Sequence, residues 1–330
     1  MRVLFIGSKR MGLKALRRMY EISPNELIGA ITIEDGRDTR SVFGDFFRYC
    51  DNINLPLHTV ANKAEFNEIV MELKPDICFV VGWYWIIDKR ILDSVPRGFI
   101  GVHNSLLPKY RGCAPLVWAI INDENEVGFS LFSFTEDMDA GDIWSTGAIP
   151  VHEDDYIDDI LYKLEDKLLS VLDEKYLSIL RGEIEPYPQK HEDATFCAPR
   201  IPADGEIDWS RPARYIYKFI RAQSKPYPGA YTIYKGRMLK IWRAKPYDAQ
   251  YFGTPGQVAW KSKEGVYVVC GDNRVIILEN VEFDDIAENA NKFIKSLKTR
   301  FGSKNIRNSK DRSASKEDSS EPGRITKALA

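Results

Sequence analysis

The chain has 330 residues and a formal net charge of -2, and hydrophobic residues make up 44% of it. This length exceeds what most single hydrophobic cores support, so we expect two domains in a globular protein rather than a membrane-spanning or collagen-like chain. A near-neutral charge disfavours nucleic-acid binding without excluding it, because a local basic patch needs no global excess of positive charge. The apolar run that ends at Gly7 is too short for a signal peptide, which predicts a cytoplasmic protein.

The cysteines indicate neither a disulfide framework nor a metal site. They are odd in number, scattered, and form no Cys-x-x-Cys pair, and no histidine lies near them at zinc-site spacing. We therefore expect no bound metal. The five cysteines are Cys50, Cys78, Cys113, Cys197 and Cys270.

The first half of the chain alternates strand and helix patterns. Val3 to Ile6 is an apolar run, a glycine-containing turn follows, and apolar residues then recur at helical spacing. This alternation favours an α/β fold with an open, mostly parallel, Rossmann-like sheet. The further strands are expected at 27–33, 53–58, 77–81 and 98–103, with helices near 62–73 and 88–94.

Two more strands, at 128–135 and 143–150, precede a long amphipathic helix at 155–181 that Gly182 ends. Beyond it, a short helix and several strand patterns predict a small β-rich, OB-like domain. The expected organisation is a catalytic domain at 1–185, a linker at 186–210, the β-rich domain at 211–301 and a disordered tail at 302–330.

His103 is the strongest candidate for chemistry. It ends an apolar strand and precedes a loop rich in proline and glycine, and imidazole changes charge near physiological pH. Asp139 lies in a second loop that also leaves a strand, so the two side chains are expected to converge. A histidine bonded only to backbone, and an ordinary Asp-Ala-Gly-Asp turn, are the alternative interpretations.

These residues, taken together, resemble the 10-formyltetrahydrofolate-dependent formyltransferase family. The match consists of His103 followed by Ser-Leu-Leu-Pro at 105–108, Arg-Gly at 111–112, Ala-Pro at 114–115 and Met-Asp-Ala-Gly-Asp at 138–142. The segments 204–209 and 226–230 resemble the start of the C-terminal domain of methionyl-tRNA and amino-sugar formyltransferases. The resemblance covers roughly residues 1–280 and implies the formyltransferase fold.

The resemblance implies an enzyme in which a primary amine attacks the formyl group on N10 of the folate. Protonated His103 stabilises the oxyanion of the tetrahedral intermediate, and Asp139 holds the imidazole charged and helps to take up the amine proton. N10-formyltetrahydrofolate is then a co-substrate. The resemblance assigns its pocket to Trp85, Ile86, Ile87, Ser105, Leu106, Leu107, Pro108, Thr135, Glu136, Asp137 and Met138.

Gly101 departs from the family pattern, which has an asparagine two residues before the histidine. Asn104 does not obviously replace it, because neighbouring positions of a strand face opposite sides. Loss of one oxyanion donor typically lowers a rate by roughly 10²- to 10³-fold. Another group or a water supplies the contact, or the reaction is slow or different, or the chain is a folate- or nucleotide-binding protein that has lost turnover.

The acceptor is expected to be a nucleotide-linked amino sugar, with methionyl-tRNA as the alternative. Methionyl-tRNA formyltransferases usually carry a long basic loop after the second strand, whereas residues 34–41 here are of mixed charge. Acidic residues in that place would repel tRNA phosphates. We predict diphosphate contacts from Lys9, Arg10 and Arg40 and no membrane partner, and a homodimer is an arrangement that the sequence allows.

Overall fold

The computed structural model describes residues 1–302 as two compact units. Unit 1 comprises Met1–Gly205 and Lys218–Ala230, and unit 2 comprises Glu206–Tyr217 and the chain from Tyr231 onward. The chain therefore passes between the units three times, whereas the sequence suggested one linker at 186–210. From residue 303 onward, the tail expected from the sequence lies outside the described residues.

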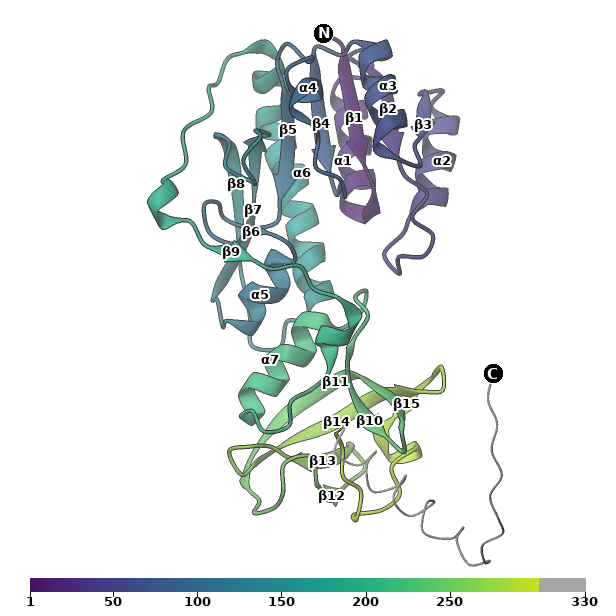
Figure 1. The fold of residues 1–330 in the computed structure, drawn as a ribbon, viewed down its shortest axis with the longest axis vertical. Helices are drawn as coiled ribbons and strands as arrows, with labels where there is room; N and C mark the ends of the chain where they lie inside the picture. Colours follow the sequence, from purple (N-terminus) through teal and green to yellow (C-terminus); the bar gives the residue numbers. More distant parts are fainter. Residues whose placement is uncertain (303–330) are drawn as a thin grey trace, which may run out of the picture. The chain divides into compact units, whose positions relative to one another are not determined.

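Unit 1 is built on a seven-stranded sheet with the order β3-β2-β1-β4-β5-β7-β8 (Figure 1). Neighbouring strands from β3 to β5 are parallel, while β7 runs antiparallel to β5 and β8 antiparallel to β7. The mostly parallel sheet predicted from the sequence is confirmed. The strands are β1 Val3–Gly7, β2 Leu27–Thr32, β3 Leu57–Thr59, β4 Ile77–Val81, β5 Phe99–His103, β7 Glu126–Ser133 and β8 Ile143–Pro150.

Alternating residues of the central strands send two sets of apolar side chains to opposite faces of the sheet. On one face, Phe5 packs against Phe46 of α2 and Phe79 against Tyr176 of α6. On the other, Leu4 and its neighbours form one cluster with residues of α3 and α4. The helices are α1 Lys9–Ile22, α2 Phe43–Asn52, α3 Lys63–Leu73, α4 Lys89–Leu92, α5 Pro115–Ile121, α6 Ile157–Arg181 and α7 Ala213–Gln223.

A small two-stranded parallel sheet joins the segment after α6 to the loop after β5. Its strands are β6 (Arg111–Gly112) and β9 (Phe196–Cys197). The segment 186–205, which the sequence suggested as part of a linker, therefore belongs with unit 1 and carries one strand of this sheet.

Unit 2 contains a six-stranded sheet with the order β10-β11-β14-β13-β12, in which β15 also pairs with β14 (Figure 1). The pairs β11–β14, β13–β14, β12–β13 and β14–β15 are antiparallel, which confirms the β-rich second domain. The strands are β10 Ala230–Tyr234, β11 Arg237–Gln250, β12 Val258–Lys261, β13 Val266–Val269, β14 Arg274–Phe283 and β15 Ile286–Asn289.

One predicted element of unit 1 was misplaced and one helix was missed. The strand expected at 53–58 is only Leu57–Thr59, because residues up to Asn52 form helix α2 and Asn54 then turns the chain with a positive φ of 54°. The helix α2 itself was not predicted. Elsewhere, the expected long helix is present as α6, and Gly182 ends it with a φ of 68°.

Candidate active site

His103 is the last residue of β5, and its side chain is 10% exposed. Its Nε2 atom lies 2.8 Å from the carbonyl oxygen of Tyr110. Because a carbonyl oxygen accepts and never donates a hydrogen bond, Nε2 carries a proton in this arrangement. The other ring nitrogen, Nδ1, lies 3.6 Å from Oδ2 of Asp139. The Tyr110 backbone thus orients the imidazole with Nδ1 toward the carboxylate.

Asp139 is held in place from two directions. Its Oδ2 accepts a hydrogen bond of 2.8 Å from the backbone N–H of Gly112, in β6. Its own carbonyl oxygen accepts a bond of 2.9 Å from Nε2 of Gln189. The residue has a φ of 50°, a left-handed conformation that aspartate tolerates better than most side chains. The structure therefore brings the two predicted catalytic residues together.

Gln189 connects the Asp139 loop to β6. Its side chain is buried, its Oε1 accepts from Nη2 of Arg111 at 2.6 Å, and its Nε2 also donates to the carbonyl of Gly141 at 2.7 Å. Sequence reasoning missed Gln189 and the backbone groups of Tyr110 and Gly112. Residues 111–112 belong to the motif that carried the resemblance, but nothing around residue 189 marks it in the sequence.

The loop after His103 is fixed by hydrogen bonds to β7. Ser130 donates to the carbonyl of Ser105 at 2.9 Å and accepts from the backbone N–H of Leu107 at 3.0 Å. Leu107 is buried against Phe132. Leu106 lies so close to Gly128 that a Cβ there would come within 2.4 Å of its Cδ2. Leu106 and Leu107, two of the predicted folate contacts, thus take part in packing.

The other predicted folate residues fall into buried and exposed groups. Ile87 is only 6% exposed and belongs to the cluster under α3 and α4, and Trp85 packs on Trp83 with ring centroids 5.3 Å apart. Ile86, in contrast, is 80% exposed, and Met138 is also exposed. Of the remaining four residues, Pro108 is half-buried, and Thr135, Glu136 and Asp137 are exposed.

Comparison with known proteins gives matches over most of the chain. The family model "Formyl transferase" matches residues 35–174, and "Formyl transferase, C-terminal domain" matches residues 201–298. The methionyl-tRNA formyltransferase of Caldanaerobacter subterraneus subsp. tengcongensis is 36% identical over 288 residues, which are 84% of this chain and 91% of that protein. The chain belongs to the formyl transferase family.

Other formyl transferases extend this likeness. The methionyl-tRNA formyltransferase of Acetivibrio thermocellus is 32% identical over 86% of this chain and 92% of its own length. Among solved structures, the sugar 3N-formyl transferase WlaRD, crystallised with dTDP and 5-N-formyl-THF, has a TM-score of 0.65 and 17% identity. That likeness covers 89% of this chain and 99% of WlaRD, and at this identity it supports the fold alone.

In this formyl transferase, Phe134 fills the space beside Gly101. A Cβ built on Gly101 would lie 1.9 Å from Cε1 and 2.6 Å from Cζ of the Phe134 ring. Phe134 follows β7 and bonds through its N–H to the carbonyl of Phe99 at 2.8 Å. The place where an asparagine at 101 would start its side chain is therefore occupied by an aromatic ring.

The cations predicted to bind diphosphate are already paired with carboxylates. Lys9 Nζ lies 2.6 Å from Asp35 and 2.8 Å from Asp38. Arg40 bonds Asp38 with both Nε and Nη2, at 3.0 and 2.7 Å. Burial alone would raise the pKa of Asp38, but the Arg40 guanidinium and the Lys9 ammonium outweigh it and hold that pKa well below its usual range.

Arg10 lies apart from this charge cluster and pairs with α6. Its Nε donates to Glu165 at 2.7 Å, and its guanidinium lies 3.7 Å from the centroid of the Tyr162 ring. Lys9 and Arg40 therefore share one charge cluster around Asp38, and Arg10 lies outside it.

Residues 1–302 of this formyl transferase show neither a membrane-spanning helix nor a metal-binding cluster. In that part of the chain, no helix is both long and apolar enough to cross a membrane. The same residues include no group of three or more His, Cys, Asp or Glu side chains arranged to hold a metal ion.

Proposed function

We propose that this chain transfers the formyl group of N10-formyltetrahydrofolate to the amino group of methionyl-tRNA. The observation that carries the reaction is the pair of His103 and Asp139 at the carboxyl end of β5, the edge of a parallel sheet where ligands usually bind. The acceptor rests on the two methionyl-tRNA formyltransferases described above, whose similarity to this chain extends over about nine-tenths of their own length.

The chemistry follows from the orientation of the imidazole. The amine nitrogen attacks the formyl carbon, and the tetrahedral intermediate carries a negative oxygen. Nδ1–H of protonated His103 donates to that oxygen, since Nε2–H is engaged by the Tyr110 carbonyl. Asp139 takes up the proton that the amine loses. The bond between the carbon and N10 then breaks, N10 takes up the proton that Asp139 received, and the products are the formylated amine and tetrahydrofolate.

Trp83 supports a flat polar ligand such as the pterin ring of the donor. Its Nε1 atom is buried and has no hydrogen-bond partner among the described residues. A buried donor without a partner is costly, so a ligand oxygen or nitrogen is its natural acceptor. The ring packs between Phe66 and Trp85, and Ile86 nearby in the chain presents an exposed apolar side chain. One solved relative, HypX from Aquifex aeolicus, was crystallised with tetrahydrofolic acid.

A nucleotide-linked amino sugar is the second candidate acceptor, and the charge cluster at Lys9 favours it. Affinity for tRNA depends on cations that neutralise phosphates. Lys9 and Arg40 are instead neutralised by Asp35 and Asp38. The loop after β2 therefore offers a tRNA backbone less positive charge than its lysine and arginine content suggests.

The test is a formyl-transfer assay with N10-formyltetrahydrofolate and either methionyl-tRNA or a panel of nucleotide-linked amino sugars. We expect formyl-methionyl-tRNA, and its loss in the His103→Ala and Asp139→Asn variants. His152→Ala is the matched control, because that histidine is exposed and lies outside the site. Transfer to a sugar alone would establish the second candidate. Folate binding without transfer to any acceptor would contradict both candidates and indicate a binding protein.

A further inference from the structure

A cavity of about 480 Å³ lies beside the loop that follows His103, and all of its lining residues belong to unit 1. Its walls come from that loop, from α5 and the residues that follow it, and from β9 with its flanking residues. Its volume lies within the range of small-molecule sites. The lining residues are Lys109, Tyr110, Trp118, Asn122, Glu124, Thr195, Phe196, Cys197 and Ala198.

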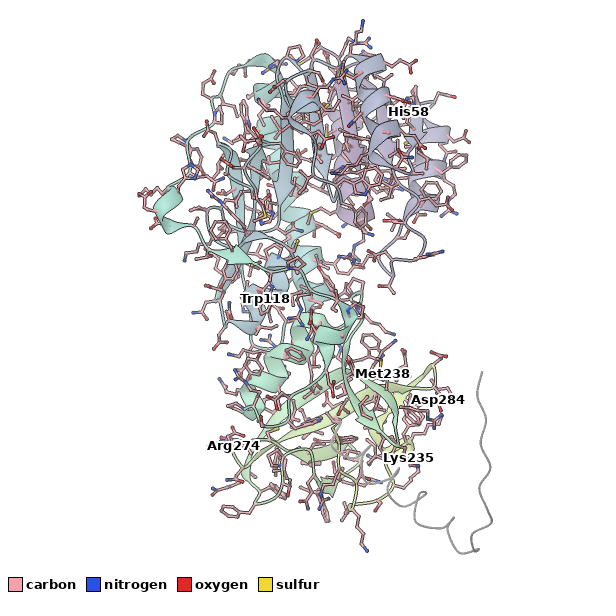
Figure 2. All side chains as sticks on the ribbon, in the orientation of Figure 1. His58, Trp118, Lys235, Met238, Arg274 and Asp284 are labelled. Carbon is pink, nitrogen blue, oxygen red and sulfur yellow. The ribbon has the colours of Figure 1, made fainter. Side chains whose placement is uncertain are left out.

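Three aromatic side chains line this cavity. Phe196 is 65% exposed, although phenylalanine is normally buried. Trp118 extends from α5 (Figure 2), and its Nε1 donates to the carbonyl of Ala198 at 3.2 Å. Tyr110 is the third, and its hydroxyl donates to Oε1 of Glu124 at 2.6 Å. The exposed ring of Phe196 suits a flat heteroaromatic ring, which stacks on it. Tyr110 and Trp118 are partly buried beside it, and the Arg200 guanidinium lies 5.0 Å from the centroid of the Trp118 ring.

Lys109 gives the cavity a cation suited to phosphate. Its side chain is exposed, and it forms none of the ion pairs that the structure shows among residues 1–302. Lys9, Arg10 and Arg40, by contrast, are each paired with carboxylates. A phosphate group is therefore accommodated more readily at Lys109 than at the three cations suggested by the sequence. The carbonyl and amide groups of Asn122 add hydrogen-bonding capacity on the cavity wall.

Tyr110 connects this cavity to the catalytic pair. Its side chain lines the cavity, while its backbone carbonyl accepts the bond from Nε2 of His103. A ligand that packs against the Tyr110 ring therefore contacts the same residue whose backbone carbonyl orients the imidazole. The cavity is well situated for a part of the acceptor that lies outside the reacting amine.

We propose that this cavity binds the nucleotide that carries the acceptor amine, with the base among Tyr110, Trp118 and Phe196 and a phosphate at Lys109. The inference rests on the proposed formyl transfer. It holds for either acceptor, because methionyl-tRNA ends in an adenosine nucleotide and a nucleotide-linked sugar carries a nucleoside diphosphate. The shared ligand chemistry is a base with its ribose and phosphate.

Isothermal titration calorimetry on the full chain tests this assignment with AMP, UDP, dTDP and GDP as probes. We expect at least one probe to bind, and its dissociation constant to rise at least 10-fold in Phe196→Ala and in Lys109→Ala. Phe47→Ala and Lys63→Ala are matched controls, because both residues are exposed and lie away from the cavity. Preferred binding of AMP indicates the end of a tRNA, and preferred binding of a diphosphate indicates a nucleotide-linked sugar.

Steady-state kinetics separate this inference from the proposed acceptor. In Phe196→Ala, whose side chain is largely exposed, the KM for the acceptor should rise at least 10-fold while the KM for N10-formyltetrahydrofolate stays within twofold. Formylation of methionyl-tRNA with an unchanged acceptor KM would overturn the cavity assignment and leave the proposed function standing. A rise only in the folate KM would also overturn it, since the cavity would then hold the donor. The parent chain could fail to formylate methionyl-tRNA while Phe196→Ala and Lys109→Ala still lose nucleotide binding. That result would support the cavity assignment and refute methionyl-tRNA as the acceptor.

Discussion

The Phe134 ring fills the space beside Gly101, two residues before His103, and limits which side chains position 101 can carry. An asparagine at 101 would put its Cβ within 1.9 Å of the Phe134 ring. Overpacking of this kind typically lowers the free energy of unfolding by about 1–3 kcal/mol. We therefore expect Gly101→Asn to be destabilised in urea unfolding, and the cost to shrink when Phe134→Ala provides space.

A double-mutant cycle measures this coupling. The Gly101→Asn/Phe134→Ala protein should be more stable than the sum of the two single effects by about 1 kcal/mol or more, because the residues touch. Phe132→Ala with Gly101→Asn serves as the comparison, since Phe132 packs next to Phe134 but is not the ring that would clash. Effects of Gly101→Asn and Phe134→Ala that simply add would refute the steric explanation.

Asp38 is expected to give the fold a pH-dependent contribution. Its pKa is held below the ordinary value by Arg40 and Lys9, so the ionised carboxylate stabilises the folded state above its ordinary pKa near 4. That contribution is lost as the pH falls through the lowered pKa. Asp38→Asn should therefore reduce the free energy of unfolding at pH 7, and its difference from the parent should narrow below about pH 4.

Urea unfolding from pH 7 down to pH 3 would show this narrowing. Asp45→Asn is the control, because Asp45 pairs with Arg48 on an exposed helix surface. Such pairs contribute little, so the control should change the free energy of unfolding by less than about 0.5 kcal/mol. If the free energies of unfolding of Asp38→Asn and the parent differ by the same amount from pH 7 down to pH 3, the assigned role of Asp38 is contradicted.

At the scale of elements, the β6–β9 sheet with Gln189 positions the catalytic pair. Gly112 of β6 donates to Asp139, and Gln189 joins the Asp139 loop to Arg111 of the same strand. Gln189→Ala should leave these buried groups unpaired, which lowers stability by about 1–3 kcal/mol. We also expect kcat to fall by about 10-fold or more, because small displacements of reacting groups are costly.

The kinetic pattern distinguishes this positioning role from a binding role. KM for N10-formyltetrahydrofolate should change by less than twofold in Gln189→Ala, with the loss confined to kcat. Gln257→Ala is the control for removing a hydrogen-bonded glutamine, since its side chain caps Thr254 within unit 2. An unchanged kcat would show that Asp139 needs no support from Gln189.

Elements with strong apolar periodicity could be predicted from the sequence, and those fixed by tertiary contacts could not. The central strands and α6 follow from apolar runs and a helical stripe. The short strand β9 has two residues and exists because β6 pairs with it. The same division holds in the site: the convergence of His103 and Asp139 follows from strand ends, whereas Gln189 acts only because the folded chain brings it to Asp139.

At the scale of the whole molecule, unit 1 needs residues well beyond the long helix α6. It includes β9, and it also includes Arg221 of α7, which is buried and donates to the carbonyls of His152 and Asp155 at 3.0 and 2.7 Å. The sequence placed the end of the catalytic domain at 185, because the amphipathic stripe ends near there and Pro186 and Pro188 follow. The return of residues 218–230 to unit 1 depends on contacts that no local pattern encodes.

Truncation tests this organisation. A fragment of residues 1–230 keeps every residue of unit 1, whereas a fragment of residues 1–185 loses Gln189, β9 and Arg221. The shorter fragment would leave the Asp139 loop without its Gln189 bond and would remove the fully buried Ile220 from unit 1. We expect fragment 1–230 to unfold cooperatively by circular dichroism, and fragment 1–185 to melt at least 10 °C lower, since a loss of about 1 kcal/mol lowers Tm by roughly 2–4 °C at this size.

Fragment 1–300 serves as the control because it retains nearly all of the described residues of unit 2. Equal melting temperatures for fragments 1–185 and 1–230 would mean that unit 1 is complete at residue 185, and that the later segments contribute nothing to its stability.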